Sequence, residues 1–519
     1  MRWKAWLPWL VLAAVSVFWL ARWPTFPLAL DPAYHLSIAR QMQAAGGVLA
    51  YEWWEAAPVG RPHLYPPVIH LLLTPLLALG LSPLFILRLF TVAVVPAVLL
   101  AVYATTTRLG RREAAGAPDL GWACLLACLV PFTWFLQIGE ALASGFALIE
   151  LLWLLVAVRE RCWRAASCLM ALLWYTHLGM PWIALAALGW ALLFKAVPEP
   201  RQAARAIGWG TVAALPWLLH LARHLSSFQI AGRLENSLVE INPLLVFCAA
   251  FGAWHAWRAR DAAGRLLVAL WLGSAVLAFP FLFRWVSGEG VVPVCLLAGY
   301  GAAGLADRWA GSRAAAAARW FGMTALLVGL WLSPTLVIQR QAQGWTASVS
   351  WLDSAPFHLA NEQAGRLKAA DLQIYGPHLE RLAQRVRQLT QPGEILWSNA
   401  AYAGGLMAAL AQRPTSSAMF YEVQPAGAFD PVAAAQWVIW FKIDLPGMPR
   451  LPRLIERYGL ALVADEPLAL IYRRREGAAP ARPPRAAVPL WAAGMLLWTF
   501  LGVSIWQLRQ RKDYALSNG

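Results

Sequence analysis

Long apolar runs alternate with short basic segments along most of the chain. Apolar runs of roughly the 20 residues that a membrane-spanning helix needs recur as far as residue 338, and once more at 487–506. The segments between them carry small groups of Lys and Arg, such as Arg108, Arg111 and Arg112. Cytoplasmic loops are enriched in these residues. The pattern therefore predicts a polytopic α-helical membrane protein with each basic group on the cytoplasmic side.

Threading the chain by these two rules predicts about twelve spans with both termini in the cytoplasm. Spans are expected at 6–22, 84–106, 121–135, 146–158, 321–338 and 487–506, and in hairpins whose outer turns are THLGMP, the loop 224–242 and FRWVSGEG. The first run resembles a signal peptide. It ends in bulky tryptophans and lacks a small-residue cleavage site, so we expect a retained helix.

Two external segments are predicted. The loop 23–83 contains a short apolar stretch, 68–79, which we expect to lie in or dip into the outer leaflet. Residues 339–485 have mixed polarity, with helical periodicity at 379–389 and strand-like patterns further on, which predict a small extracytoplasmic α/β domain. The expected organisation is thus a transmembrane domain over residues 1–338, the α/β domain over 339–485, and the last span with a cytoplasmic tail over 486–519.

Composition agrees with this placement. The chain is 60% hydrophobic and 13% charged, and its net charge of +16 is spread over the basic loops rather than gathered into a nucleic-acid-binding patch. The six cysteines fall in or beside apolar segments, with none in 339–485, so neither a disulfide framework nor a Cys-based zinc site is indicated. We expect a protein of the cytoplasmic (inner) membrane with its chemistry on the outer face.

Several charged residues are expected at the outer ends of helices. Asp31, Glu140, Glu240 and Glu289 all fall there, and carboxylates near the hydrocarbon boundary usually mark a pathway or a site. Carboxylates that converge can hold Mg²⁺ or Mn²⁺, and such a cation suits a substrate that carries phosphate. Arg284, on the same face, could bind phosphate through its forked guanidinium.

Structural alternatives exist for each candidate. Asp31 precedes a proline at the start of a helical run and could be an N-cap, as could Glu140. Arg284 could anchor a helix end, and His63 and His70 could be satisfied interface histidines.

Five segments resemble, in order, motifs of membrane glycosyltransferases of the C-type fold, in particular the catalytic subunit of bacterial or archaeal oligosaccharyltransferase. They are DPAYHLSIARQM, APVGRPHLYPPVIHLL, QIGEALASG, SLVEINPLLVFCAAFG and FRWVSGEGVVPVCLLAGYG. The resemblance implies transfer of a sugar or glycan from a polyprenyl-phosphate or polyprenyl-diphosphate donor to a protein, lipid or glycan acceptor outside the cytoplasm.

The same resemblance assigns roles to individual residues. Asp31 and Glu140 correspond to catalytic residues that also ligate a divalent cation, Mg²⁺ or Mn²⁺, with His63 as a further candidate ligand. Arg284 corresponds to the residue that contacts the donor phosphates, and Glu240 to the one that tethers the acceptor.

The external domain departs from the family pattern. Where the family has Trp-Trp-Asp-Tyr-Gly, this chain has EILWSNAAYAGG, with Trp397 and Asn399 as candidate acceptor-binding residues. Three alternatives remain: a single-sugar transferase with a lipid or glycan acceptor, a non-catalytic homologue that binds lipid-linked glycans, and a transporter of such glycans. A transporter would need polar residues through the bilayer midplane, where only Arg88 and Glu150 stand out.

Overall fold

The computed structural model of the 519-residue chain describes most of its length. The described residues are 6–21, 23, 30–110, 120–131, 142–228, 238–278, 282–286, 288–308, 313–341, 344–351, 354, 377–417, 419, 422–442, 450–475 and 479–517. Glu140 lies outside these ranges.

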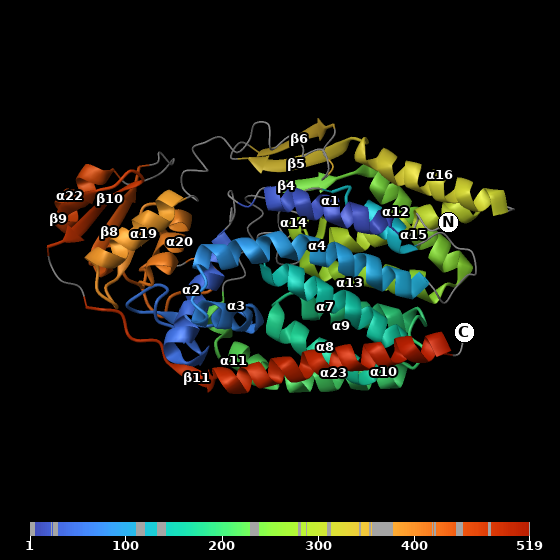
Figure 1. Ribbon diagram of the computed structural model, residues 1–519, viewed down its shortest axis with the longest axis horizontal. Helices are drawn as coiled ribbons and strands as arrows, with labels where there is room; N and C mark the ends of the chain where they lie inside the picture. The colour runs from blue at the N-terminus through green and yellow to red at the C-terminus, as the bar shows by residue number, and fades with distance from the viewer. Residues whose placement is uncertain are drawn as a thin grey trace.

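Helices that run along the long axis of the molecule form its main body (Figure 1). They are α1 (Leu7–Ala21), α4 (Pro83–Gly110), α5 (Leu120–Ala127), α7 (Leu142–Arg159), α8 (Trp163–Thr176), α9 (Met180–Leu193), α10 (Pro200–Ala213), α11 (Leu215–Arg223), α12 (Pro243–Ala259), α13 (Ala262–Ser274), α15 (Val291–Arg308), α16 (Arg313–Trp331) and α23 (Leu490–Ser517). Every segment predicted as a span overlaps one of these helices.

The bundle has the character of a membrane domain. Within the described residues, the segments Pro83–Gly110, Arg284–Ala306 and Leu490–Gln510 are each long and apolar enough to cross a bilayer. Along α23, Trp491 and Trp498 are 70% and 69% exposed, which suits a helix whose outer side meets lipid. The count of about twelve spans stays a prediction, because among the described residues only these three segments meet both the length and the hydropathy of a spanning helix.

The predicted end of the span at 321–338 is wrong. The span expected at 321–338 ends at Trp331, and Thr335–Gln341 forms β5, the middle strand of a sheet with β4 (Leu238–Ile241) and β6 (Gly344–Ser350). Pro334 lacks the N–H that would continue the helix, and the residues after it include the β-branched Thr335 and Val337, which favour a strand.

The first external loop folds into two helices and three short strands. These are α2 (Leu30–Ala45), β1 (Gly47–Leu49), β2 (Tyr51–Glu52), β3 (Arg61–Pro62) and α3 (Val68–Ala78). The stretch predicted to dip into the outer leaflet is thus helical. It packs against α2, and its residues Ile69, His70 and Leu73 are fully buried.

A small α/β unit lies at one end of the bundle, drawn in orange and red in Figure 1. Its strands β7 (Leu396–Ser398), β8 (Trp437–Phe441), β10 (Ala469–Arg474) and β9 (Leu460–Asp465) form one sheet in the order β7-β8-β10-β9, with β7 parallel to β8 and the other pairs antiparallel. Its helices are α19 (Pro377–Leu389), α20 (Ala401–Ala411), α21 (Pro431–Ala434) and α22 (Leu451–Tyr458). The predicted helix at 379–389 is confirmed.

The α/β unit shares its core with the first loop. Leu36 and Ile38 of α2 and Ile69 of α3 belong to the same buried cluster as Leu406 of α20 and Ile439 of β8. Since the two segments bury each other's apolar surface, neither has a complete core of its own. The first loop therefore holds the α/β unit against the bundle.

The return from the α/β unit to the membrane is also fixed to the first loop. Residues Ala486–Pro489 form β11, which pairs antiparallel with β1 and leads directly into α23. At Gly47 a side chain would lie 2.3 Å from the carbonyl oxygen of Val488, so the close pairing of these two strands depends on glycine at that position.

We expect Gly47→Ala to separate β1 from β11 and to lower the melting temperature of the purified protein, because backbone atoms cannot move aside as a flexible side chain can. Gly322→Ala on α16 is the matched control, since its added Cβ meets nothing within 4 Å and alanine favours a helix. Equal melting temperatures for Gly47→Ala and Gly322→Ala would contradict the proposed tight pairing.

Candidate active site

Asp31 lies where the bundle, the first loop and the α/β unit meet. It is in the first turn of α2, a helix whose residues 32–39 are all buried. Burial raises the pKa of Asp31 to about 6; the positive charge of Arg284 opposes this rise, and the negative charges of Glu422 and Glu289 add to it. The structure therefore brings Asp31, Glu289 and Arg284 together, as the sequence predicted, and adds one further carboxylate, Glu422.

Arg284 lies beside a row of buried polar side chains that contact one another. It lies on α14 (Leu282–Val286) with its side chain 27% exposed, and its Nη1 is 3.8 Å from Oε1 of Glu289. The hydroxyl of Ser144 donates to the same Oε1 at 2.9 Å, and Nε2 of His177 is 3.2 Å from the Ser144 oxygen. Glu289 is thus fixed beside Arg284 by groups from α7 and from the turn after α8.

The tautomer of His177 follows from its other contacts. Its Nδ1 accepts hydrogen bonds from the backbone N–H of Gly179 and Met180 at 3.0 and 3.3 Å. The proton therefore lies on Nε2, which donates to Ser144. Burial lowers the pKa of His177 to about 4, against the negative charge of Glu289, so the ring is neutral at pH 7.

A second buried network joins the first loop to the α/β unit. Nε of Arg61 donates to Glu52 at 2.7 Å and its Nη2 to Glu55 at 3.4 Å, and these three side chains are at most 1% exposed. Tyr34 and His63 also donate to Glu52, each at 2.6 Å. Although burial raises the pKa of Glu52, Arg61 and His63 hold it below its usual value.

Backbone groups of the α/β unit complete this network. Glu55 accepts from the N–H of Met419 at 3.0 Å, and Arg61 donates to the carbonyl of Val423 at 3.4 Å. The segment that carries Glu422, next to Asp31, is therefore attached to the first loop on either side. We call the contacts of Arg61 with Glu52, Glu55 and Val423, and of Glu55 with Met419, the Arg61 clamp.

Three histidines lie between the Arg61 clamp and Asp31. His35 follows Asp31 by one turn of α2, its Nδ1 is 3.0 Å from Nε2 of His70, and the rings of His70 and His63 have their centroids 5.2 Å apart. Burial lowers the pKa of His35 to about 3. Tyr65 packs edge-on against His35. Burial, and next the negative charge of Asp31, raise the pKa of its hydroxyl.

The described residues do not form a metal site. Among them, no three His, Cys, Asp or Glu side chains are arranged to hold an ion. His63 uses its Nδ1 on Glu52, and Glu140, the other predicted ligand, lies outside the described ranges. The predicted Mg²⁺ or Mn²⁺ site with Asp31, Glu140 and His63 stays a prediction.

The predicted acceptor residues lie in two places. Glu240 is half-buried on β4, which packs against α14, the helix of Arg284. Trp397 packs within the α/β unit. Asn399 exchanges hydrogen bonds with the main chain of Phe441, at 3.0 and 2.7 Å, and so extends the pairing of β7 and β8.

Sequence reasoning missed the Arg61 clamp, Tyr65, Ser144 and Glu422, and it left His177 without a role. One signal was available: the stretch 52–63 places two glutamates, an arginine and a histidine within twelve residues of a largely apolar chain. Charges at that density in such surroundings are usually paired or functional. No local signal could have identified Glu422, because only the tertiary fold brings its charge close enough to act on Asp31.

Comparison with known proteins rests on structure. No protein-family model matches the chain, and no curated protein is similar enough in sequence to be matched. Among solved structures, ArnT from Cupriavidus metallidurans bound to undecaprenyl phosphate matches with a TM-score of 0.51 and 15% identity, over 92% of this chain and 99% of that one. This chain has the C-type fold of membrane glycosyltransferases.

A second structure of this fold agrees. The archaeal oligosaccharyltransferase AglB from Archaeoglobus fulgidus, in complex with an inhibitory peptide and a dolichol-phosphate, matches with a TM-score of 0.50 and 12% identity, over 85% of this chain and 70% of that one. At these identities the similarity shows the C-type fold alone.

We expect Arg61→Met to destabilise the protein by about 3–5 kcal/mol, because Glu52 and Glu55 would remain buried without their cation. Thermal and denaturant unfolding in detergent would measure the loss. Arg457→Gln is the control, since that arginine is 71% exposed in its pair with Asp430 and surface pairs contribute little.

A triple variant, R61M/E52Q/E55Q, should regain some of the lost stability, because no uncompensated charge would remain. If Arg61→Met unfolds no more easily than Arg457→Gln, the Arg61 clamp does not hold the two segments together.

Proposed function

We propose that this protein is a membrane glycosyltransferase that transfers a sugar or glycan from a polyprenyl-phosphate or polyprenyl-diphosphate donor to an acceptor at the outer membrane face. The observation that carries the proposal is the placement of a half-buried carboxylate, Asp31, close enough to Arg284 for the two charges to interact, with Arg284 beside a buried chain of polar side chains. The carboxylate of Asp31 can accept a proton from the acceptor, and the guanidinium of Arg284 can bind the phosphate that leaves.

In the proposed reaction the acceptor attacks the anomeric carbon of the sugar while the bond from that carbon to the phosphate oxygen breaks. The proton of the acceptor passes to the carboxylate of Asp31, and the lipid phosphate leaves with the bonding electrons. The attack comes from the side opposite the phosphate, so the anomeric configuration is inverted. A general base works best when its pKa lies near the operating pH, and a pKa of about 6 for Asp31 meets that condition.

Arg284 is the proposed donor-phosphate clamp. A guanidinium presents two parallel N–H groups to phosphate oxygens and keeps its charge at any physiological pH. Its contact with Glu289 is long, at 3.8 Å, which exceeds hydrogen-bond length, so a phosphate oxygen can compete for the guanidinium. Because charge grows on the phosphate as the bond breaks, a fixed cation there stabilises the transition state more than the ground state.

No step of the proposed reaction uses the divalent cation that the family resemblance implies. When bound at Asp31 and Glu140 it would neutralise phosphate charge. Among the described residues Asp31 is accompanied by a guanidinium, and the nearby carboxylate of Glu289 is already engaged by Ser144 and Arg284. The proposed roles of Asp31 and Arg284 therefore do not depend on this cation.

A lipid or single-sugar acceptor is a second candidate to the oligosaccharyltransferase-like reaction, and one observation favours it. The side chain of Asn399 is occupied by the main chain of Phe441 and Trp397 packs within the α/β unit, so two residues at the position of the family's peptide-binding signature support the sheet. Glu240 on β4 is the proposed acceptor tether in either case.

We expect Asp31→Asn to reduce transfer about 10²–10⁴-fold, the usual loss when a general base is removed. In the native protein kcat/KM should fall as pH drops below about 6, since protonation of Asp31 removes the base. Purified protein incubated with radiolabelled polyprenyl-phosphate sugars and candidate acceptors would report both effects, with melting temperature as the control for folding. Native activity in Asp31→Asn would exclude this residue as the base.

Replacement of Arg284 should act on kcat. Arg284→Met removes the cation and should lower kcat about 10²–10³-fold, whereas Arg284→Lys keeps the charge without the fork and should lose less. Arg223→Met, which replaces an exposed arginine at the end of α11, serves as the control. A purely structural role for Arg284 would instead lower the melting temperature of the methionine and lysine variants equally and leave their kcat alike.

A further inference from the structure

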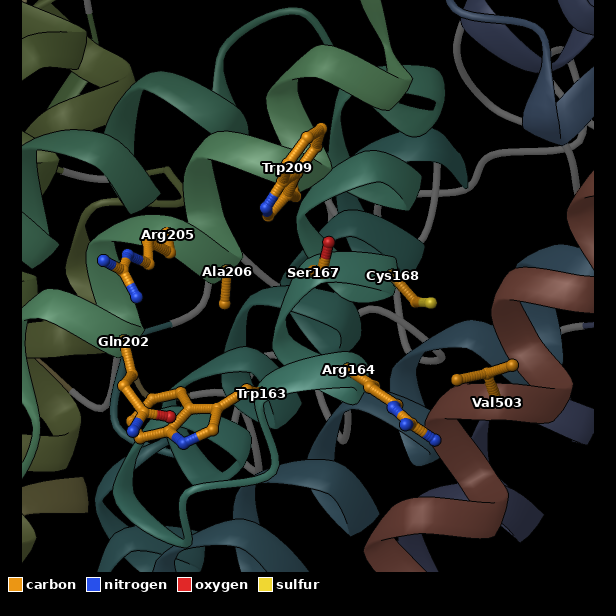
Figure 2. A pocket seen from close by; sticks show the side chains of 9 residues that line it. All are labelled: Trp163, Arg164, Ser167, Cys168, Gln202, Arg205, Ala206, Trp209 and Val503. Carbon is orange, nitrogen blue, oxygen red and sulfur yellow. The ribbon is translucent and has the colours of Figure 1, made fainter.

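A pocket of about 570 Å³ opens between α8, α10 and α23 (Figure 2). It is lined by Trp163, Arg164, Ser167 and Cys168 of α8, by Gln202, Arg205, Ala206 and Trp209 of α10, and by Val503 of α23. In Figure 2 the side chains of Arg164 and Arg205 come from different helices that border the same space.

Helical spacing explains why these residues share one face. On α10 the lining positions 202, 205, 206 and 209 follow the i, i+3, i+4, i+7 rule, and on α8 the pairs 163 with 167 and 164 with 168 are one turn apart. The two helices approach closely at Gly210, where a Cβ would lie 2.4 Å from the carbonyl oxygen of Ser167. This contact therefore fixes how closely α8 and α10 approach each other beside the pocket.

The pocket lies in the half of the bundle that is distant from the α/β unit. The backbone N–H of Ala165, next to Arg164, donates to the side chain of Gln507 at 2.7 Å. Gln507 is roughly 25 Å along α23 from Leu490, the residue that follows β11. The basic loops around α8 and α10 predict that this half faces the cytoplasm.

Positive charge in the pocket is not balanced by its own lining. Arg164 and Arg205 are both exposed, and the lining contains no acidic residue. The acidic residue just before α10, Glu199, pairs instead with Arg161 at 3.0 Å. The lining thus contains two arginines and no carboxylate. In Figure 2 the side chain of Arg164 extends toward α23 and that of Arg205 toward the opposite side.

The surroundings of the arginines are apolar. Trp209 is 68% exposed, and Trp506, one turn along α23 from Val503, is 51% exposed. Exposed tryptophan side chains are typical of the membrane–water interface. A ligand that satisfies both sides of the pocket needs an anionic group for the arginines and a hydrocarbon chain for the tryptophans and Val503.

We propose that this pocket binds an anionic phospholipid of the cytoplasmic leaflet, with its phosphate attracted by the positive charges of Arg164 and Arg205 and an acyl chain along α23. Basic pockets between helices on the cytoplasmic side suit such headgroups, and the forked guanidinium matches phosphate geometry. This inference is independent of the transferase function, because it involves none of the residues around Asp31.

Cys168 supplies a native reporter of occupancy. It lines the pocket and is half-buried, whereas the other five cysteines are buried. Phosphatidylglycerol added to the detergent-purified protein should slow maleimide labelling of Cys168, and phosphatidylcholine at the same concentration should not. Cys168→Ser should remove the labelled product and so show that the signal comes from this residue.

The two arginines should make the protection of Cys168 depend on the negative charge of the lipid. We expect R164Q/R205Q to weaken the protection by phosphatidylglycerol about 30-fold, at about fivefold for each arginine near an anionic lipid. Arg201→Gln is the matched control, because Arg201 is exposed on the same helix and does not line the pocket. It should leave the protection unchanged, and melting temperatures would show that the variants are folded.

Three results would overturn the proposal. They are equal protection by phosphatidylcholine, an equal loss of protection in Arg201→Gln and R164Q/R205Q, and full protection by inorganic phosphate alone, which would indicate a soluble anion rather than a lipid.

Discussion

A buried guanidinium needs its carboxylates, and the half of this molecule that contains the α/β unit is organised around that requirement. Arg61 is fully buried between Glu52 and Glu55, and its network ends on backbone groups of the α/β unit. Charges taken out of water are tolerated only when each is paired and hydrogen-bonded. The first loop and the α/β unit must therefore stay in one relative position. In that position the charge of Glu422 acts on Asp31.

The candidate active site uses the same physics with a different outcome. In the Arg61 clamp one buried guanidinium is bonded to two carboxylates, whereas the charge of Arg284 is shared among three, those of Glu289, Asp31 and Glu422. Burial and this excess of negative charge raise the pKa of Asp31 toward the range in which a carboxylate works as a base. The buried chain from His177 through Ser144 to Glu289 holds the cation still, as catalysis by a preorganised charge requires.

The two phosphate-binding sites that we propose differ in form. Near the α/β unit a single arginine is backed by buried hydrogen bonds, which suits a group that must be held in one geometry. At the other end two exposed arginines border an open pocket beside tryptophans, which suits a ligand that is retained but does not react. The C-type fold places both between helices that have apolar outer surfaces.

By itself the sequence determined the membrane class, the position of nearly every long helix, the elements of the α/β unit, and Asp31 and Arg284 as candidates. These follow from local rules: apolar length, charge between spans, and periodicity. Only the tertiary structure decided which distant residues meet. The Arg61 clamp, the approach of Glu422 to Asp31, the pairing of β11 with β1 and the turn of 335–341 from helix to strand all depend on partners elsewhere in the chain, and local sequence carries no record of such partners.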